Sequence, residues 1–153
     1  MRAAPDIPPS RVRLSDRDHH LAPKPPAAQL LSREVLSVDE TTGEVTLRFV
    51  AKPEFANRHG TVQGGFLAAM LDSATAMAVM LSLPPDMTAV TTRLDVSYLK
   101  PASVGEIRAT SRVTRRDARA AEAEAQLHDD NQRVLATAKA ELRILPQKLQ
   151  SER

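Results

Sequence analysis

The sequence predicts an α+β domain in which six antiparallel strands wrap around one long central helix. One observation is that residues 66–83 are apolar or small at almost every position, as in a helix that is buried on all sides. The other is that five further segments alternate apolar and polar residues with the two-residue period of a strand, and a sixth, residues 31–38, precedes the first of them across a glycine turn. A helix without a polar face needs a covering layer, and a curved antiparallel sheet supplies one.

The strands are expected on both sides of this helix. Two precede it as a hairpin that turns at residues 39–43, and four follow it as a meander. Pro84 and Pro85 end the helix, because proline cannot continue its hydrogen-bond ladder. The expected strands cover residues 31–38, 44–51, 87–99, 106–114, 118–127 and 133–145.

Composition and period disagree in the last two of these segments. Both are rich in Ala, Glu, Gln and Leu, which favour helices. Their apolar residues nevertheless recur at every second position, from Ala121 to Leu127 and from Val134 to Ile144, with Leu135 as the exception. A helix would scatter the intervening charges around its axis. We therefore follow the period and expect two strands joined by a turn at residues 129–131.

Length and composition limit the organisation of the chain. At 153 residues it forms one domain. We expect an irregular, proline-rich arm at residues 1–28, the folded domain at 29–147 and a tail at 148–153. The absence of cysteine excludes disulfides, thiolate nucleophiles and cysteine-based metal sites.

Charge and hydropathy bear on location and partners. No cationic segment followed by an apolar block marks a secretory signal, so a cytoplasmic location is expected. Asp72 interrupts the apolar helix and leaves too short a stretch after it to cross a bilayer, so no membrane partner is expected. The net charge of +2, without a basic cluster, argues against a nucleic-acid partner.

The start of the central helix is a candidate binding site. The polar segment 57–65 contains three glycines, and Gly64 and Gly65 stand where the helix begins. The first N–H groups of a helix have no partner within it and lie at the positive end of its dipole. The Gly pair therefore suits an anion, or an oxygen that becomes one during a reaction.

Asp72 is the one charged residue of the central helix. An unpaired carboxylate in a dry helix is costly, so we expect a partner for it. The residue is either a structural acid that pairs with a donor or a functional acid, because perturbed buried acids cluster at active sites without being confined to them.

Several of these residues together resemble the hotdog-fold acyl-CoA thioesterases, in particular the branch related to phenylacetate-degradation thioesterases. The resemblance covers roughly residues 37–145 and implies a six-stranded antiparallel sheet around one helix. It also implies homodimers, often assembled into homotetramers. The matching residues are Asn57, Gly60, Gly64, Gly65, Asp72, Thr91 and the run Tyr98-Leu99-Lys100-Pro101.

The resemblance implies a catalytic role at four positions. Gly64 would donate its backbone N–H to the thioester carbonyl oxygen, and Asp72 would act as general base or nucleophile. Asn57 would hold the water or the thioester, and Thr91 would steady the carboxylate or the water. Without the spacing, Asn57 would be read as a turn or cap residue and Thr91 as an ordinary strand threonine.

Three further residues are assigned to substrate binding. Gln63 stands where the family commonly has His, so it can orient a group by hydrogen bonding but cannot change charge near neutral pH. Gly65 belongs to the bare helix start, and His59 lies in the loop before it.

Spacing restricts how Gly64 and Asp72 can share a substrate. They are eight residues apart on one helix, about 12 Å along its axis. An aspartate side chain is too short to reach a carbonyl bound at Gly64 of the same chain. If both residues serve one thioester, they come from two chains, and a two-fold axis repeats the site twice per dimer.

The expected function is hydrolysis of an acyl-CoA thioester to a free acid and CoA. No metal-ligand cluster is found and no cofactor is needed, since CoA is part of the substrate. Two alternatives remain: a non-catalytic acyl-CoA binding protein, and an enoyl-CoA hydratase, which needs a histidine paired with an acid. The acyl group is open. Candidate partners for the CoA phosphates, which could equally form a solvated strand face, are Arg93, Lys100, Arg112, Arg115 and Arg116.

Overall fold

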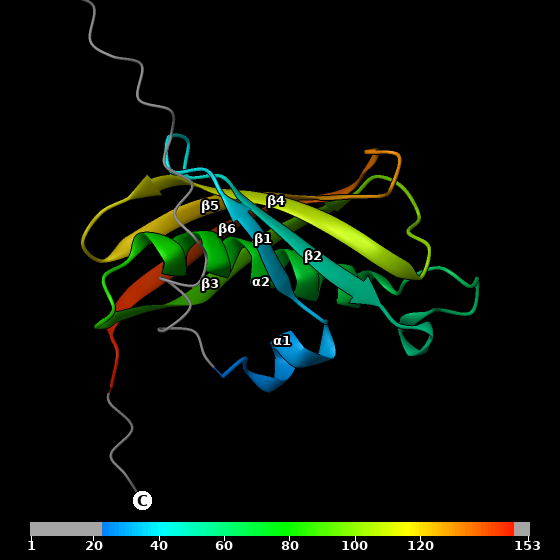
Figure 1. Ribbon diagram of the computed structural model, residues 1–153, viewed down its shortest axis with the longest axis horizontal. Coiled ribbons are helices and arrows are strands. Elements are labelled where there is room, and N and C mark those ends of the chain that lie inside the picture. The colour runs from blue at the N-terminus through cyan, green and yellow to red at the C-terminus, as the bar shows by residue number, and fades with distance from the viewer. Residues whose placement is uncertain (1–22, 149–153) are drawn as a thin grey trace, which may run out of the picture.

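The computed structural model describes residues 23–148, and Figure 1 shows one long helix lying along a curved sheet. The elements are α1 (Pro26–Leu30), β1 (Glu34–Val38), β2 (Val45–Ala51), a short 3-10 helix (Pro53–Phe55), α2 (Gly64–Ser82), β3 (Met87–Tyr98), β4 (Gly105–Arg116), β5 (Ala120–His128) and β6 (Val134–Pro146). The predicted α+β hotdog architecture, with a six-stranded antiparallel sheet around a central helix, is confirmed.

The strands are ordered β1-β2-β4-β5-β6-β3, and every neighbouring pair is antiparallel. The predicted four-strand meander is therefore wrong in one respect. Strand β3 pairs with β6 at the far edge of the sheet, so only β4, β5 and β6 form a meander. The two-residue period shows which face of a strand is buried, but it carries no information about which strand lies beside it.

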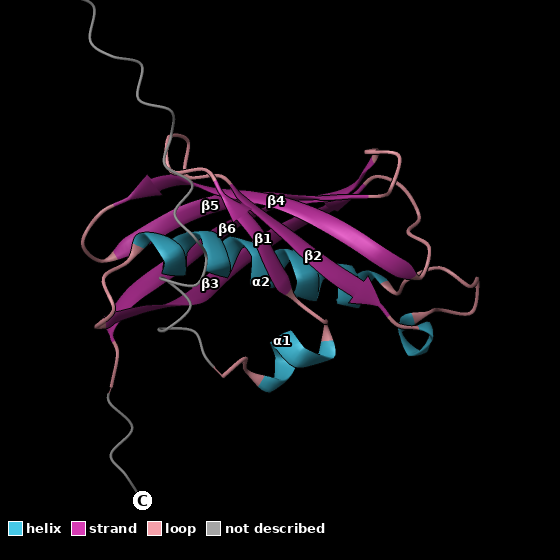
Figure 2. Ribbon diagram, in the orientation of Figure 1, coloured by secondary structure: helices cyan, strands magenta, loops and turns pink. Residues whose placement is uncertain are grey.

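The sheet covers α2 on one side (Figure 2). The buried side chains of α2 face this sheet, while Ala69 is exposed and Asp72, Ser73 and Ala76 are half-buried. The expectation of a helix buried on every side is thus wrong for the single chain. The buried residues of α2 are Leu67, Met70, Leu71, Ala74, Thr75, Met77, Ala78 and Val79.

The alanine-rich segments β5 and β6 are strands, as their period predicts. Most of their buried side chains are alanines, joined by Leu127, Leu135, Leu142 and Ile144, and both strands pack against α2. The turn between them forms where it is expected: the Asp129 carboxylate accepts the N–H groups of Asn131 and Arg133, both at 2.9 Å. The bond from the Arg133 backbone is the main reason that the pKa of Asp129 lies below its usual range.

The N-terminal end of the described chain differs from the expected irregular arm. Residues 26–30 form α1, which starts with Pro26 at its first turn and buries Ala28. The expectation of irregular chain is therefore wrong for residues 26–28. The rest of the expected arm, residues 1–22, lies outside the described residues. So does most of the expected tail, residues 149–153.

One described helix, α2, is long and apolar enough to cross a membrane by length and composition alone, so the expectation that Asp72 makes its apolar stretch too short is wrong by this criterion. Core helices of globular domains meet the same criterion, and α2 packs against strands β2 to β6.

Candidate active site

Asp72 and Thr91 meet between α2 and β3. The Thr91 hydroxyl donates a hydrogen bond to Asp72 Oδ1 at 2.7 Å. Thr91 lies at a bulge of β3, where the register against β6 shifts between Thr91 and Arg93. The second carboxylate oxygen, Oδ2, accepts no hydrogen bond from the described residues. One oxygen is thus held in place, and the other is free to take a proton or to attack.

The start of α2 presents two bare amides. Gln63 is the N-cap residue with extended angles of φ −58° and ψ 133°, and its carbonyl accepts the N–H groups of Phe66 and Leu67 at 2.9 and 3.4 Å. Within the described part of the chain, the N–H groups of Gly64 and Gly65 donate to no acceptor. Two consecutive donors at the positive end of a 19-residue helix can stabilise an oxyanion.

Contacts around the preceding loop hold this helix start in place. The Val62 N–H donates to Ala102 O and the Gln63 N–H to Phe55 O, both at 2.8 Å. The Phe55 and Phe66 rings stack with their centroids 4.1 Å apart and their planes 6° from parallel. The first turn of α2 is therefore anchored on both sides before any substrate arrives.

Tyr98 also contacts the helix start, a role that the sequence pattern does not predict. Its hydroxyl donates to the Gly64 carbonyl oxygen at 2.9 Å. The one sequence signal for this role was that Tyr98 belongs to the motif that carries the family resemblance. The contact joins residues 34 positions apart, so it depends on β3 lying beside the start of α2.

Asn57 organises its own loop. Its Nδ2 donates to Thr61 Oγ1 at 3.0 Å, and its Oδ1 accepts the backbone N–H of His59 at 2.9 Å and that of Thr61 at 3.3 Å. These contacts fit the alternative of a turn residue. The catalytic role of Asn57 stays a prediction.

The three expected substrate-binding residues are all exposed. The Gln63 side chain makes no capping bond to α2. The His59 ring forms no hydrogen bond or ion pair with another described residue, so the histidine–acid pair of a hydratase is not found there. The described residues also contain no group of three or more metal-ligating side chains.

Each chain therefore holds two separate groups of candidate site residues. The Asp72–Thr91 pair lies in the middle of α2 and the bare amides at its start, about 12 Å apart along the helix axis. The structure brings Asp72 and Thr91 together, and it brings Asn57, His59, Gln63, Gly64 and Gly65 together in one loop and helix start.

The sequence model of the thioesterase superfamily matches residues 59–136, just over half of the chain. The chain belongs to this superfamily. The matched range includes Gly64, Asp72, Thr91 and Tyr98, and it begins just after Asn57.

Individual relatives agree with this assignment. A candidate thioesterase of Ralstonia eutropha, related to phenylacetic acid degradation, is 35% identical with a TM-score of 0.79, over 84% of this chain and 97% of that one. A Bacillus halodurans protein solved with CoA is 25% identical with a TM-score of 0.67, over 77% and 74% of the two chains. The resemblance to the phenylacetate-degradation branch is thus confirmed.

A curated relative, a candidate esterase of Halobacterium salinarum, is 37% identical over 92 residues. This match spans 56% of the present chain and 60% of the length of that protein.

Besides Thr91, the chain places Arg33 near Asp72, and no sequence pattern predicts this position for it. Arg33 Nη1 donates to Ser73 Oγ at 3.1 Å on the open side of α2. Partial burial lowers the pKa of Arg33. The contact ties the start of β1 to the helix beside the candidate acid.

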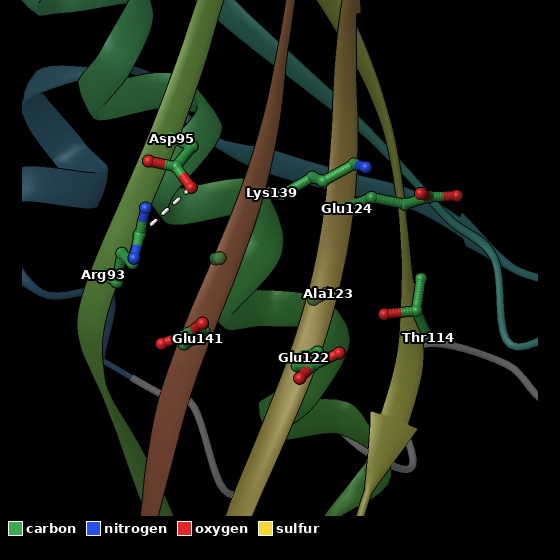
Figure 3. A pocket seen from close by; sticks show the side chains of 9 residues that line it. Arg93, Asp95, Thr114, Glu122, Ala123, Glu124, Lys139 and Glu141 are labelled. Atoms are coloured by element: carbon green, nitrogen blue, oxygen red, sulfur yellow. Dashed lines mark hydrogen bonds and ion pairs between the residues drawn. The ribbon is translucent and has the colours of Figure 1, made fainter.

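A hollow of about 340 Å³ lies elsewhere, on the outer face of the sheet (Figure 3). Its charged side chains come from β3, β5 and β6 and include the ion pair of Arg93 and Asp95 at 3.1 Å. Of the residues that the sequence singles out, only Arg93, a candidate partner for the CoA phosphates, lines it, and none of the expected catalytic or substrate-binding residues does. This hollow belongs to the solvated outer face and not to the candidate active site.

Proposed function

We propose that this protein hydrolyses acyl-CoA thioesters as a homodimer, in which Asp72 of one chain and the Gly64 amide of the other act on the same thioester. The observation that carries the proposal is the half-buried Asp72 carboxylate, whose Oδ1 accepts a bond from Thr91 while its Oδ2 accepts none from residues 23–148. An acid held by one oxygen and open at the other suits a general base or a nucleophile.

The free edge of the sheet supports a second copy as the partner. Strand β3 is 12 residues long and lies at the edge, where unpaired backbone groups are available to another strand. Val90 and Tyr98 within β3, and Leu99 directly after it, are exposed at 47%, 54% and 57%. Antiparallel pairing of two β3 strands about a two-fold axis would run the two α2 helices in opposite directions, with each Asp72 facing the partner's helix start.

The proposed reaction needs no group besides water. Asp72 Oδ2 takes a proton from water while the water oxygen bonds to the thioester carbonyl carbon, and the carbonyl oxygen becomes an oxyanion at the helix start. The C–S bond then breaks, and the CoA thiolate leaves and takes up the proton. If Asp72 attacks instead, a mixed anhydride forms and water cleaves it to the same products.

Charge supports CoA as the leaving group, as does the CoA bound in the Bacillus halodurans relative. Most candidate cations have partners: Arg93 pairs with Asp95, Arg112 with Glu124 and Arg115 with Glu122. These belong to the solvated strand face. Lys100 is exposed and follows Tyr98 closely, which makes it the candidate for the CoA phosphates.

The test is a thiol-release screen across aromatic, short-chain and long-chain acyl-CoAs, with Asp72→Asn alongside the wild-type protein. Loss of a general base or nucleophile should lower kcat by roughly 10²–10⁴-fold. Asp95→Asn is the matched control, because it makes the same chemical change at an exposed carboxylate whose partner is Arg93.

The other outcomes of this screen are equally defined. Tight acyl-CoA binding without thiol release would make the protein a binding protein. Enoyl-CoA hydration that disappears in His59→Ala would make it a hydratase. Full thiol release by Asp72→Asn would remove Asp72 from the mechanism.

A further inference from the structure

We propose that Tyr98 is a positioning residue that holds the N–H of Gly65 as a second donor to the thioester carbonyl oxygen. The inference rests on the thioesterase function proposed above. It starts from the contact between the end of β3 and the first residue of α2, which lies outside the Asp72–Thr91 pair.

Tyr98 contacts Gly64 through both its hydroxyl and its ring. The Tyr98 hydroxyl donates to the Gly64 carbonyl oxygen at 2.9 Å. A Cβ atom added to Gly64 would lie 3.2 to 3.4 Å from the end of the Tyr98 ring, closer than most real Cβ contacts. The ring thus lies directly against the helix start, at a position where glycine leaves it room.

Because the peptide group is planar, the contact at the Gly64 carbonyl also affects the direction of the Gly65 N–H. The carbonyl of Gly64 and the N–H of Gly65 belong to one planar peptide unit, and in its trans form they point in opposite directions. A hydroxyl that fixes the direction of this carbonyl therefore fixes the direction of the Gly65 N–H. That N–H donates to no acceptor within the described residues.

The same contact strengthens the donor. A hydrogen bond accepted by a carbonyl polarises the whole peptide group, and in such chains of hydrogen bonds each bond is strengthened by about 10–30%. The Gly65 N–H then carries more positive charge than an ordinary amide. Gly64 and Gly65 together would form a two-donor oxyanion hole in which one donor is set by Tyr98.

A purely structural tether between β3 and α2 would give the same distances, so the test separates the two roles. Tyr98→Phe keeps the ring against Gly64 and removes the hydroxyl alone. Ser82→Ala is the matched control, because it removes a hydroxyl that donates to the Val79 carbonyl at 2.7 Å at the opposite end of α2. Both variants are compared with the wild-type protein by thiol release and by the amide proton shift of Gly65 in a two-dimensional NMR spectrum.

For Tyr98→Phe we expect an upfield shift of the Gly65 amide proton and kcat lowered about three- to tenfold, with KM changed less than about twofold. Ser82→Ala should move neither quantity. An unshifted Gly65 amide overturns the proposal, as does a shifted amide with unchanged kcat. A dimer that dissociates in Tyr98→Phe also overturns it, because the residue would then act through the interface.

Failure of the proposed function would be seen separately. If the wild-type protein releases no thiol from any acyl-CoA, the thioesterase assignment falls. The Gly65 amide shift then decides by itself whether Tyr98 sets that donor.

Discussion

The Thr91 hydroxyl makes the two oxygens of Asp72 different, because it holds Oδ1 at 2.7 Å while no residue of the described chain donates to Oδ2. Thr91→Val keeps the branched shape that suits a strand and removes this donor. We expect kcat to fall by about tenfold, since a hydrogen bond to a charged group contributes about 1.5–3 kcal/mol and the carboxylate loses its fixed orientation. Steady-state thiol release measures the effect, and KM should change little.

Thr91→Ser is the companion variant, because it keeps the hydroxyl and removes only a methyl group. It should retain most of the wild-type kcat. Equal losses in Thr91→Val and Thr91→Ser would mean that packing, and not the hydrogen bond to Asp72, is what Thr91 supplies.

Contacts between distant residues were predictable from the sequence only where both residues belong to a family motif with an assigned role. The spacing of Asp72 and Thr91 in the family motif indicated their contact, which the structure contains. The contact of Tyr98 with Gly64 was not predicted, because it depends on β3 lying beside the start of α2. Asn57 shows the opposite case: its loop contacts follow from local sequence, since an Asn side chain readily bonds backbone groups two to four residues on.

At the scale of the helix, the bare amide of Gly64 can be deleted without breaking the element. Proline has no N–H and fits the first helical position, and Gln63 already has the extended angles that a residue before proline prefers. Gly64→Pro should therefore fold and lose kcat by about 10²–10³-fold, the cost of one oxyanion donor. Circular dichroism checks the fold and thiol release checks the activity.

Gly64→Ala separates the amide from the steric effect. Both variants add a Cβ atom about 3.2 Å from the Tyr98 ring, which must shift by a few tenths of an ångström, but alanine keeps the N–H. We expect alanine to lose much less activity than proline. Equal losses would show that crowding against Tyr98, and not the missing donor, explains the proline result.

The elements themselves were largely predictable, and their neighbours were not. Strands β5 and β6 are built from helix-favouring residues, yet tertiary packing against α2 requires one buried face, and the two-residue period reports that face. The position of β3 at the edge depends on long-range pairing with β6, which no local pattern encodes. The exposed side of α2 was not predicted either. An apolar helix sequence shows that the helix suits an apolar environment on every side, but the sheet of the single chain covers only one side.

For the whole molecule, the decisive feature is that the Asp72–Thr91 pair and the bare amides at the helix start lie about 12 Å apart on α2 of one chain. If the active site is shared, a variant that lacks Asp72 and a variant that lacks the Gly64 amide damage different halves of it. In a mixed dimer, one site then carries both defects and the other carries none. If each chain worked alone, every site in such a mixture would carry one defect.

Mixing Asp72→Asn with Gly64→Pro tests this directly. After the two proteins are unfolded and refolded together in equal amounts, half of the dimers are mixed, and each mixed dimer has one intact site. The mixture should reach about a quarter of wild-type kcat per total sites, although each parent is nearly inactive. Sedimentation checks that dimers reform, and parents refolded separately and then combined serve as the control. A co-refolded mixture no more active than the average of its parents would mean that Asp72 and the Gly64 amide do not meet across two chains.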